Sequence, residues 1–166
     1  MKRILRIVTA ITLTFFAHAF ATNDTKAGQE RNLDFKRYDR SYFERNDTGL
    51  TARTSYMVCT SQAQFDKIFG AVPTMGRNNF LPNNAFNTKV VFATIARGHF
   101  LRTYDDPKVT TKNGKIYIWY KVKDTQQESA TFASPLILAV DRDRYSQVIF
   151  MEDGKRVGAA TFPRTK

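Results

Sequence analysis

Few residues of this chain could carry out chemistry, and their positions favour binding over catalysis. His99 is the single histidine that follows residue 21, and Cys59 is the single cysteine of the chain. A Ser-His-Asp or Cys-His centre would have to use His99 as its base, yet Cys59 ends an apolar run from Tyr56 that is typical of a buried strand. Zinc sites draw several ligands from histidine and cysteine, so we predict no metal, no cofactor and no catalytic residue.

Carboxylates are more numerous, and they leave one catalytic alternative open. Two carboxyl groups about 5–9.5 Å apart are the machinery of many glycoside hydrolases. The close pairs in this sequence, Asp105-Asp106 and Asp141 with Asp143, lie among residues typical of turns. Turn formation explains them without catalysis, but a hydrolase of envelope polymer stays an alternative.

Two polar stretches supply the candidate binding residues. The first is a bend at Gly98 that follows an apolar strand, and the second is a loop, residues 76–87, with five asparagines. Loops on a rigid scaffold often carry binding, although asparagines also serve simply to form turns. The binding residues that we predict from these stretches are Arg97, His99, Arg102, Tyr104, Asn83 and Asn84.

The elements that must position these residues centre on residues 88–122. Residues 89–96 form an apolar β-branched run typical of a buried strand, and residues 115–122 alternate with a period of two. Asn113-Gly114 between them predicts a type I′ hairpin turn. We expect one sheet built around this hairpin, with Asp105-Asp106-Pro107 breaking the chain before it.

A short helix and further strands complete the predicted fold. Ser61 and Gln64 form a capping box, Phe65 and Phe69 define the buried face, and Gly70 is placed to end the helix in the left-handed conformation. A strand at 54–59 precedes this helix. Residues 130–133, 136–140, 147–151 and 156–160 predict a short strand and a three-strand meander, with a tight turn at Asp153-Gly154. The fold class is α+β, a mainly antiparallel sheet with one short helix packed on it.

The N-terminal residues predict export. Lys2, Arg3 and Arg6 precede an apolar run, residues 7–16, and Ala-x-Ala spacing predicts cleavage after Ala21. Residues 1–21 are therefore a signal peptide, 22–32 a flexible leader and 33–166 a single domain in the periplasm or secreted. The run is shorter than a membrane span, so we expect no transmembrane segment after cleavage.

Charge and aromatic residues define further possible partners. The net charge is +11, and it is +8 without the three basic residues of the signal peptide. An anionic envelope polymer is thus a possible partner, although a surface of mixed charges explains the composition equally. Tyr117, Trp119 and Lys121 share one face of a strand as in a nucleic-acid stacking platform. An exported protein meets little nucleic acid, and such a stripe is more often covered by a helix, so we predict no nucleic-acid partner.

The order of motifs resembles a known family over residues 55–150. The motifs are a strand ending before Ser61-x-x-x-Phe65-x-x-Ile68-Phe69, a proline-containing loop, a strand with Val90-Val91, and Ser134-Pro135-Leu136 entering a later strand. This arrangement resembles the PrcB-type domain of exported bacterial protease-complex accessory proteins. Members usually carry Gly-Gly-Tyr after the central strand, whereas five residues separate Gly98 from Tyr104 here. The resemblance implies a noncatalytic module that binds another exported protein, as an accessory or inhibitor of a protease.

Overall fold

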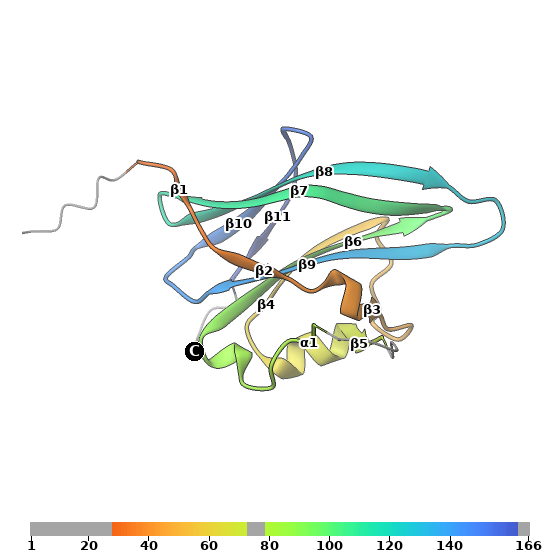
Figure 1. Ribbon diagram of the computed structural model, residues 1–166, viewed down its shortest axis with the longest axis horizontal. Coiled ribbons are helices and arrows are strands. Elements are labelled where there is room, and N and C mark those ends of the chain that lie inside the picture. Colours follow the sequence, from red (N-terminus) through yellow and green to blue (C-terminus); the bar gives the residue numbers. More distant parts are fainter. Residues whose placement is uncertain (1–27, 73–78, 163–166) are drawn as a thin grey trace, which may run out of the picture.

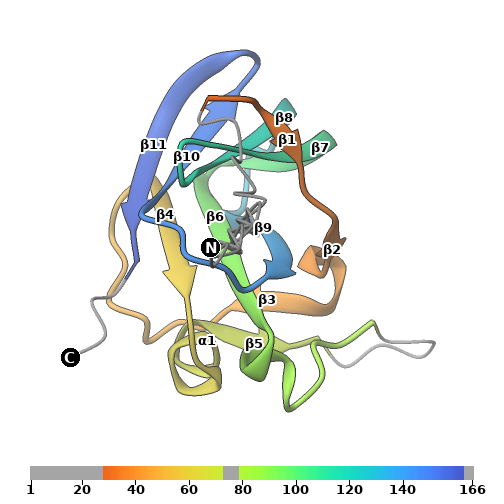
Figure 2. The same ribbon diagram turned by 90° about the vertical axis from the view of Figure 1, so that its left-hand side faces the viewer.

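Two β-sheets packed face to face form the body of the molecule, and a thin third layer covers one of them (Figures 1 and 2). The structure is a computed structural model that describes residues 28–72 and 79–162. The five-stranded sheet has the order β1-β7-β8-β10-β11, and the four-stranded sheet has the order β2-β9-β6-β4. The third layer contains α1 and the two-stranded pair β3-β5.

The element bounds follow the chain. The strands are β1 (Arg31–Asn32), β2 (Phe35–Arg37), β3 (Tyr42–Glu44), β4 (Thr54–Cys59), β5 (Phe69–Ala71), β6 (Lys89–Gly98), β7 (Phe100–Lys112), β8 (Lys115–Gln126), β9 (Phe132–Asp141), β10 (Gln147–Glu152) and β11 (Lys155–Thr161). The helices are α1 (Gln62–Ile68) and the 3₁₀ turns η1 (Asp39–Ser41) and η2 (Ala85–Asn87). No helix in the described ranges has the length and apolar run of a membrane span, and the predicted signal peptide lies outside those ranges.

The four-stranded sheet is the middle layer, which explains the unbroken apolar run in β6. Alternate residues of a strand point to opposite faces. Val90 and Phe92 therefore pack toward the five-stranded sheet, and Val91 and Ile95 pack toward α1. The predicted buried strand is confirmed, and its burial on both faces follows from its place between two layers.

Both predicted tight hairpins are present. Asn113-Gly114 joins β7 to β8 with φ angles of 53° and 68°, and Asp153-Gly154 joins β10 to β11 with φ angles of 49° and 80°. Positive φ at both central residues is the signature of the type I′ turn that Asn-Gly and Asp-Gly favour.

The predictions of a single sheet and of a C-terminal meander are wrong. β9 lies in the four-stranded sheet between β2 and β6, and β10 pairs with β8, in parallel, in the other sheet. Two parallel strands need a long crossover connection, and here the crossover runs through β9 in the neighbouring layer. The backbone N–H of Ser146 donates to the carbonyl of Gly114, 2.9 Å away, and brings the start of β10 beside the start of β8. The fold is therefore mostly antiparallel with one parallel pair.

Two predicted breaks lie inside continuous strands. Asp106 has a φ of 49°, and the pairing of β7 with β8 shifts register between Asp105 and Lys108. The acidic pair thus forms a β-bulge, which bends the strand without ending it. Pro135 lies within β9, opposite Ile95. β2 pairs only with Leu138–Val140 of β9, so the edge at Pro135 has no strand partner that needs its missing N–H.

The helix begins as predicted and ends differently. The Ser61 hydroxyl accepts from the N–H of Gln64 at 3.3 Å, while the Gln64 side chain accepts from the N–H of Thr60, 2.8 Å away, one residue before the cap. Phe65 and Phe69 are buried, as predicted. The left-handed end at Gly70 is wrong: Gly70 lies in β5, where a side chain would collide with the ring of Phe43.

The end of the predicted flexible leader is ordered in the described residues. Arg31 and Asn32 pair with β7, and the chain then crosses to pair with β9 as β2. One segment thus joins the edges of both sheets at one side of the molecule (Figure 2).

Candidate functional site

Arg97, the first residue of the predicted bend, is used to hold two layers together. Its guanidinium donates to both carboxylate oxygens of Glu44 on β3, with Nε 2.7 Å from Oε2, and also to the carbonyl of Ala52 and the hydroxyl of Ser55. The side chains of Arg97 and Glu44 are 16% and 7% exposed. The pair therefore fastens the third layer to the middle sheet.

Arg102 and Tyr104 are also committed to internal contacts. Arg102 forms a bidentate pair with Asp124, both distances 2.8 Å, and a third contact with Glu152 at 3.1 Å. Hydrogen bonding to Asp124 raises the pKa of Arg102. Tyr104 is buried, its hydroxyl donates to the carbonyl of Ser134 at 2.9 Å, and burial raises its pKa.

The remaining predicted residues are exposed but far apart. His99 lies in the bend at the end of β6, whereas Asn83 and Asn84 lie just before η2, which leads into the start of β6. Ten residues of extended strand span about 33 Å, so the bend and the loop do not form one continuous surface. The start of the predicted loop, residues 76–78, lies outside the described residues. Binding by these six residues stays a prediction.

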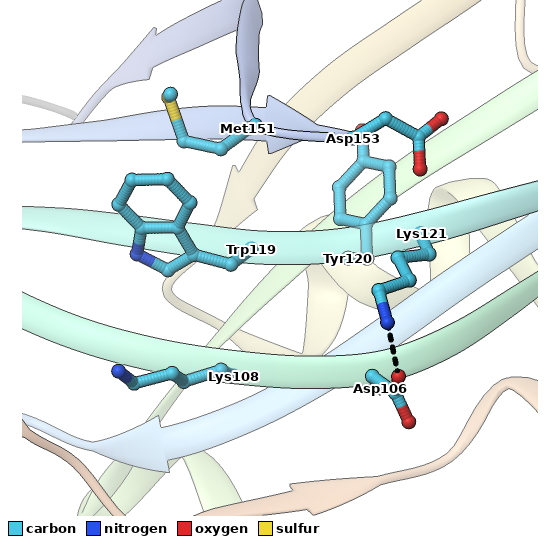
Figure 3. Close-up of a pocket in the computed structure, with 8 residues that line it drawn as sticks. Asp106, Lys108, Trp119, Tyr120, Lys121, Met151 and Asp153 are labelled. Carbon is cyan, nitrogen blue, oxygen red and sulfur yellow. Dashed lines mark hydrogen bonds and ion pairs between the residues drawn. The ribbon is translucent and has the colours of Figure 1, made fainter.

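A pocket on the outer face of the five-stranded sheet is the strongest candidate site (Figure 3). It has a volume of about 530 Å³. We call it the Trp119 pocket; it is lined by Asp106, Lys108, Trp119, Tyr120, Lys121, Met151, Asp153 and Gly154. The strand register brings these residues together, because Trp119 lies opposite Lys108 of β7 on one side and Met151 of β10 on the other.

Trp119 is held in place rather than loosely exposed. Its indole N–H donates to the hydroxyl of Thr110 at 3.1 Å, and its ring lies nearly parallel to that of Tyr117, with centroids 6.3 Å apart and planes 23° apart. Figure 3 shows the indole between Met151 and Lys108. A fixed aromatic ring beside a flexible thioether offers large apolar contact area at low entropic cost.

The rim of the pocket is charged. Lys121 contacts the carboxylate of Asp106 at 2.8 Å, a pairing that lowers the pKa of Asp106 and raises that of Lys121. Lys108 and Asp153 complete the rim. Exposed pairs of this kind contribute little to stability, so these charges are available for a ligand.

No described element covers this face, which corrects the interpretation of the Tyr117–Trp119 stripe as a core or helix-covered surface. The helix α1 packs against the other sheet, on the side away from Trp119 (Figure 2). Both Tyr117 and Trp119 are half-buried by their own neighbours on the sheet.

The chemical groups considered for catalysis lie away from this pocket. Cys59 is buried, and burial raises the pKa of its thiol to about 12. Asp124 and Glu152 both contact Arg102, which holds these two carboxylates as ion-pair partners. In the described residues no three histidine, cysteine or acidic side chains are grouped as metal ligands would be.

Sequence reasoning found part of this site and missed the rest. The alternation along β8 placed Tyr117, Trp119 and Lys121 on one face, as the structure confirms. Met151, Lys108 and the two aspartates were missed, because only the parallel pairing of β10 with β8 and the bulge in β7 bring them to Trp119.

Comparisons of the chain with family models, with curated proteins and with solved structures found no match. The likeness to the PrcB-type domain stays a prediction from the sequence motifs. The functional argument therefore depends on the geometry of the Trp119 pocket.

Proposed function

We propose that this protein is an exported, noncatalytic binding module that contacts another envelope or secreted protein through the Trp119 pocket. The observation that carries the proposal is the pocket itself: a fixed tryptophan and a methionine on an uncovered sheet face, surrounded by lysines and aspartates. Tryptophan and methionine are enriched in protein–protein interfaces, where an apolar centre is bordered by a polar rim.

The size of the pocket supports a protein side chain as its occupant. A space of about 530 Å³ lies within the usual range for small ligand sites and can take one large apolar side chain with its neighbours. The aliphatic stems of Lys108 and Lys121 extend the apolar wall while their charges stay in water.

The resemblance to exported protease-complex accessory proteins supports a narrower proposal. The partner is a protease or a protein assembled with one, and this module stabilises or inhibits it. Such a role needs a docking surface and no catalytic group.

A basic binder of anionic envelope polymer is the second candidate, favoured by Lys108, Lys112, Lys115, Lys121 and Lys123 on β7 and β8. Its affinity would fall steeply as salt rises. A hydrolase of envelope polymer is less well supported, since Asp124 and Glu152 are both paired with Arg102.

The test is crosslinking in the envelope of the native host. A photo-crosslinking amino acid at Lys108 should give one discrete protein adduct, and Trp119→Ala in the same chain should abolish it. The matched control places the crosslinker at Phe43, an exposed aromatic residue in the third layer, where the adduct should not form. Fractionation of the same cells checks export.

Three results would overturn the proposal. They are retention of the chain in the cytoplasm, an adduct that survives Trp119→Ala, and the same adduct from position 43.

A further inference from the structure

Strand β8 has an open edge beside the Trp119 pocket. β7 pairs with β8 as far as Gln126, but β10 pairs with β8 only from Lys115 to Tyr120, after which the chain turns away at Asp153-Gly154. In the described residues, the edge of β8 from Val122 to Gln126 therefore has no strand partner on the side of β10. Figure 1 shows this half of the β7–β8 hairpin extending past β10 and β11.

The direction of the backbone groups on this edge follows from two hydrogen bonds. The carbonyl of Tyr120 faces β10, because it accepts from the N–H of Asp153 at 3.0 Å. The carbonyl of Lys123 faces β7, where it accepts from the hydroxyl of Thr103 at 3.3 Å. Since the direction alternates along a strand, the N–H and C=O groups of Val122 and Asp124 point out from the open edge.

We propose that the partner supplies an extended acidic segment that adds as a strand to this open edge and places a large apolar side chain in the Trp119 pocket. This inference rests on the proposed function and names how the partner binds. Strand addition takes its affinity from main-chain hydrogen bonds, and its specificity comes from pockets for alternate side chains. Here the pocket begins where the open edge begins, at Lys121.

The charge next to the edge selects an acidic segment. Lys121 and Lys123 lie on β8 on the outer face that carries Trp119, and Lys108 lies across from it on β7. Lysines along an edge repel a second basic strand, so a second copy of this chain would bring lysines against lysines. An acidic strand would instead pair with them.

The carboxylates in the pocket favour a peptide over a uniform polyanion. Asp106 and Asp153 both line the Trp119 pocket. A polymer with a negative charge on every unit would place one beside these carboxylates, whereas a peptide can place its apolar residue there and its acidic residues along Lys121 and Lys123.

The edge is held in shape before any partner binds. Asp124 is fixed by its bidentate contact with Arg102, which also contacts Glu152 at the end of β10. A strand that is already extended and fixed loses less entropy on pairing, which favours binding.

The experiment is a selection of random twelve-residue peptides displayed on phage against the chain from residue 22 to 166. We expect enriched peptides with at least two acidic residues and one large apolar residue. Synthetic peptides made from them should bind Trp119→Ala at least about tenfold more weakly. Lys123→Glu, an exposed substitution that leaves the fold intact, should weaken acidic peptides and Lys36→Glu on β2 should not.

Hydrogen exchange separates strand addition from binding in the pocket alone. Bound peptide should slow exchange of the Val122 and Asp124 amides at least about tenfold, while the Lys121 and Lys123 amides, which face β7, should change little. Peptides that need Trp119 but leave the Val122 and Asp124 amides unprotected would overturn strand addition and leave the proposed function standing.

Other outcomes overturn the inference directly. These are enrichment of neutral or basic peptides, or no enrichment at all, and equal binding by Lys123→Glu. Tighter binding of polygalacturonate or oligothymidylate than of any peptide, or a dimer in sedimentation that Lys123→Glu strengthens, would identify a different occupant. Crosslinking that still depends on Trp119 would show that only the binding mode was wrong.

Discussion

Removal of the Glu44 carboxylate should detach the third layer from the middle sheet. Glu44 on β3 accepts two hydrogen bonds from Arg97 on β6 and a third from the hydroxyl of Thr48 at 3.0 Å. In Glu44→Gln the positive charge of Arg97 would stay largely buried without its carboxylate. Breaking a buried pair in this way costs about 3–5 kcal/mol, and exposed pairs contribute about 0–1 kcal/mol.

The magnitude follows from the burial and the remaining partners of Arg97. The side chains are 7% and 16% exposed, close to the buried limit, but Arg97 keeps the carbonyl of Ala52 and the hydroxyl of Ser55 as acceptors. We therefore expect a loss of about 2–3 kcal/mol in the free energy of unfolding. With a urea slope of about 1–3 kcal/mol/M, the midpoint should fall by about 1 M or more.

Urea unfolding followed by circular dichroism measures this loss, and a double-mutant cycle isolates the pair. The double variant Glu44→Leu with Arg97→Met should be more stable than the sum of the single changes by about 1–2 kcal/mol. Asp141→Asn is the matched control, since Asp141 pairs with Lys89 at an exposed site and should cost less than about 1 kcal/mol. Single changes that add within about 0.5 kcal/mol would refute the argument that the pair acts as one unit.

Three further predictions concern the core, a turn and the thiol. Phe92→Ala in the inner core should cost about 3–5 kcal/mol in urea unfolding, because Phe92 is fully buried between the sheets, and a loss below about 1 kcal/mol would contradict that packing. Gly154→Ala should cost about 1 kcal/mol by the same measurement, through its φ of 80° alone, since open space surrounds the position; an unchanged midpoint would argue against the type I′ turn. Burial raises the pKa of Cys59 from 9.0 to about 12, so the neutral thiol stabilises the fold fully below pH 9 and this contribution is lost as the pH rises toward 12. The fall in the urea midpoint over that range should be smaller in Cys59→Val, and equal curves would show that the thiol does not contribute.

Local signals in the sequence were sufficient for the individual elements. Asn113-Gly114 and Asp153-Gly154 each demand positive φ, so the two hairpin turns are decided within four residues. Ser61 and Gln64 likewise identify the start of α1 without any distant contact. The burial of Phe65 and Phe69 follows from their spacing on one apolar face.

Local signals misled where a neighbouring layer changes the meaning of a residue. Gly70 resembles a helix cap, but its missing side chain makes room for the ring of Phe43. Asp105-Asp106-Pro107 and Pro135 resemble breaks, but a bulge and an unpaired strand edge accommodate them. Arg97, Arg102 and Tyr104 resemble surface residues, yet distant partners in the sequence engage them.

The sequence alone determined which segments become strands, where the tight turns lie and which face of β8 carries Trp119, because periods of two and positive φ angles are local properties of the chain. Only the tertiary structure decided that β9 leaves the sheet of its neighbours in sequence and that β10 returns parallel to β8. Pairing between distant strands depends on how whole faces are buried against one another, and a short window of residues contains no record of that. The Trp119 pocket and the open edge of β8 exist because of that pairing, since β10 supplies Met151 and then ends.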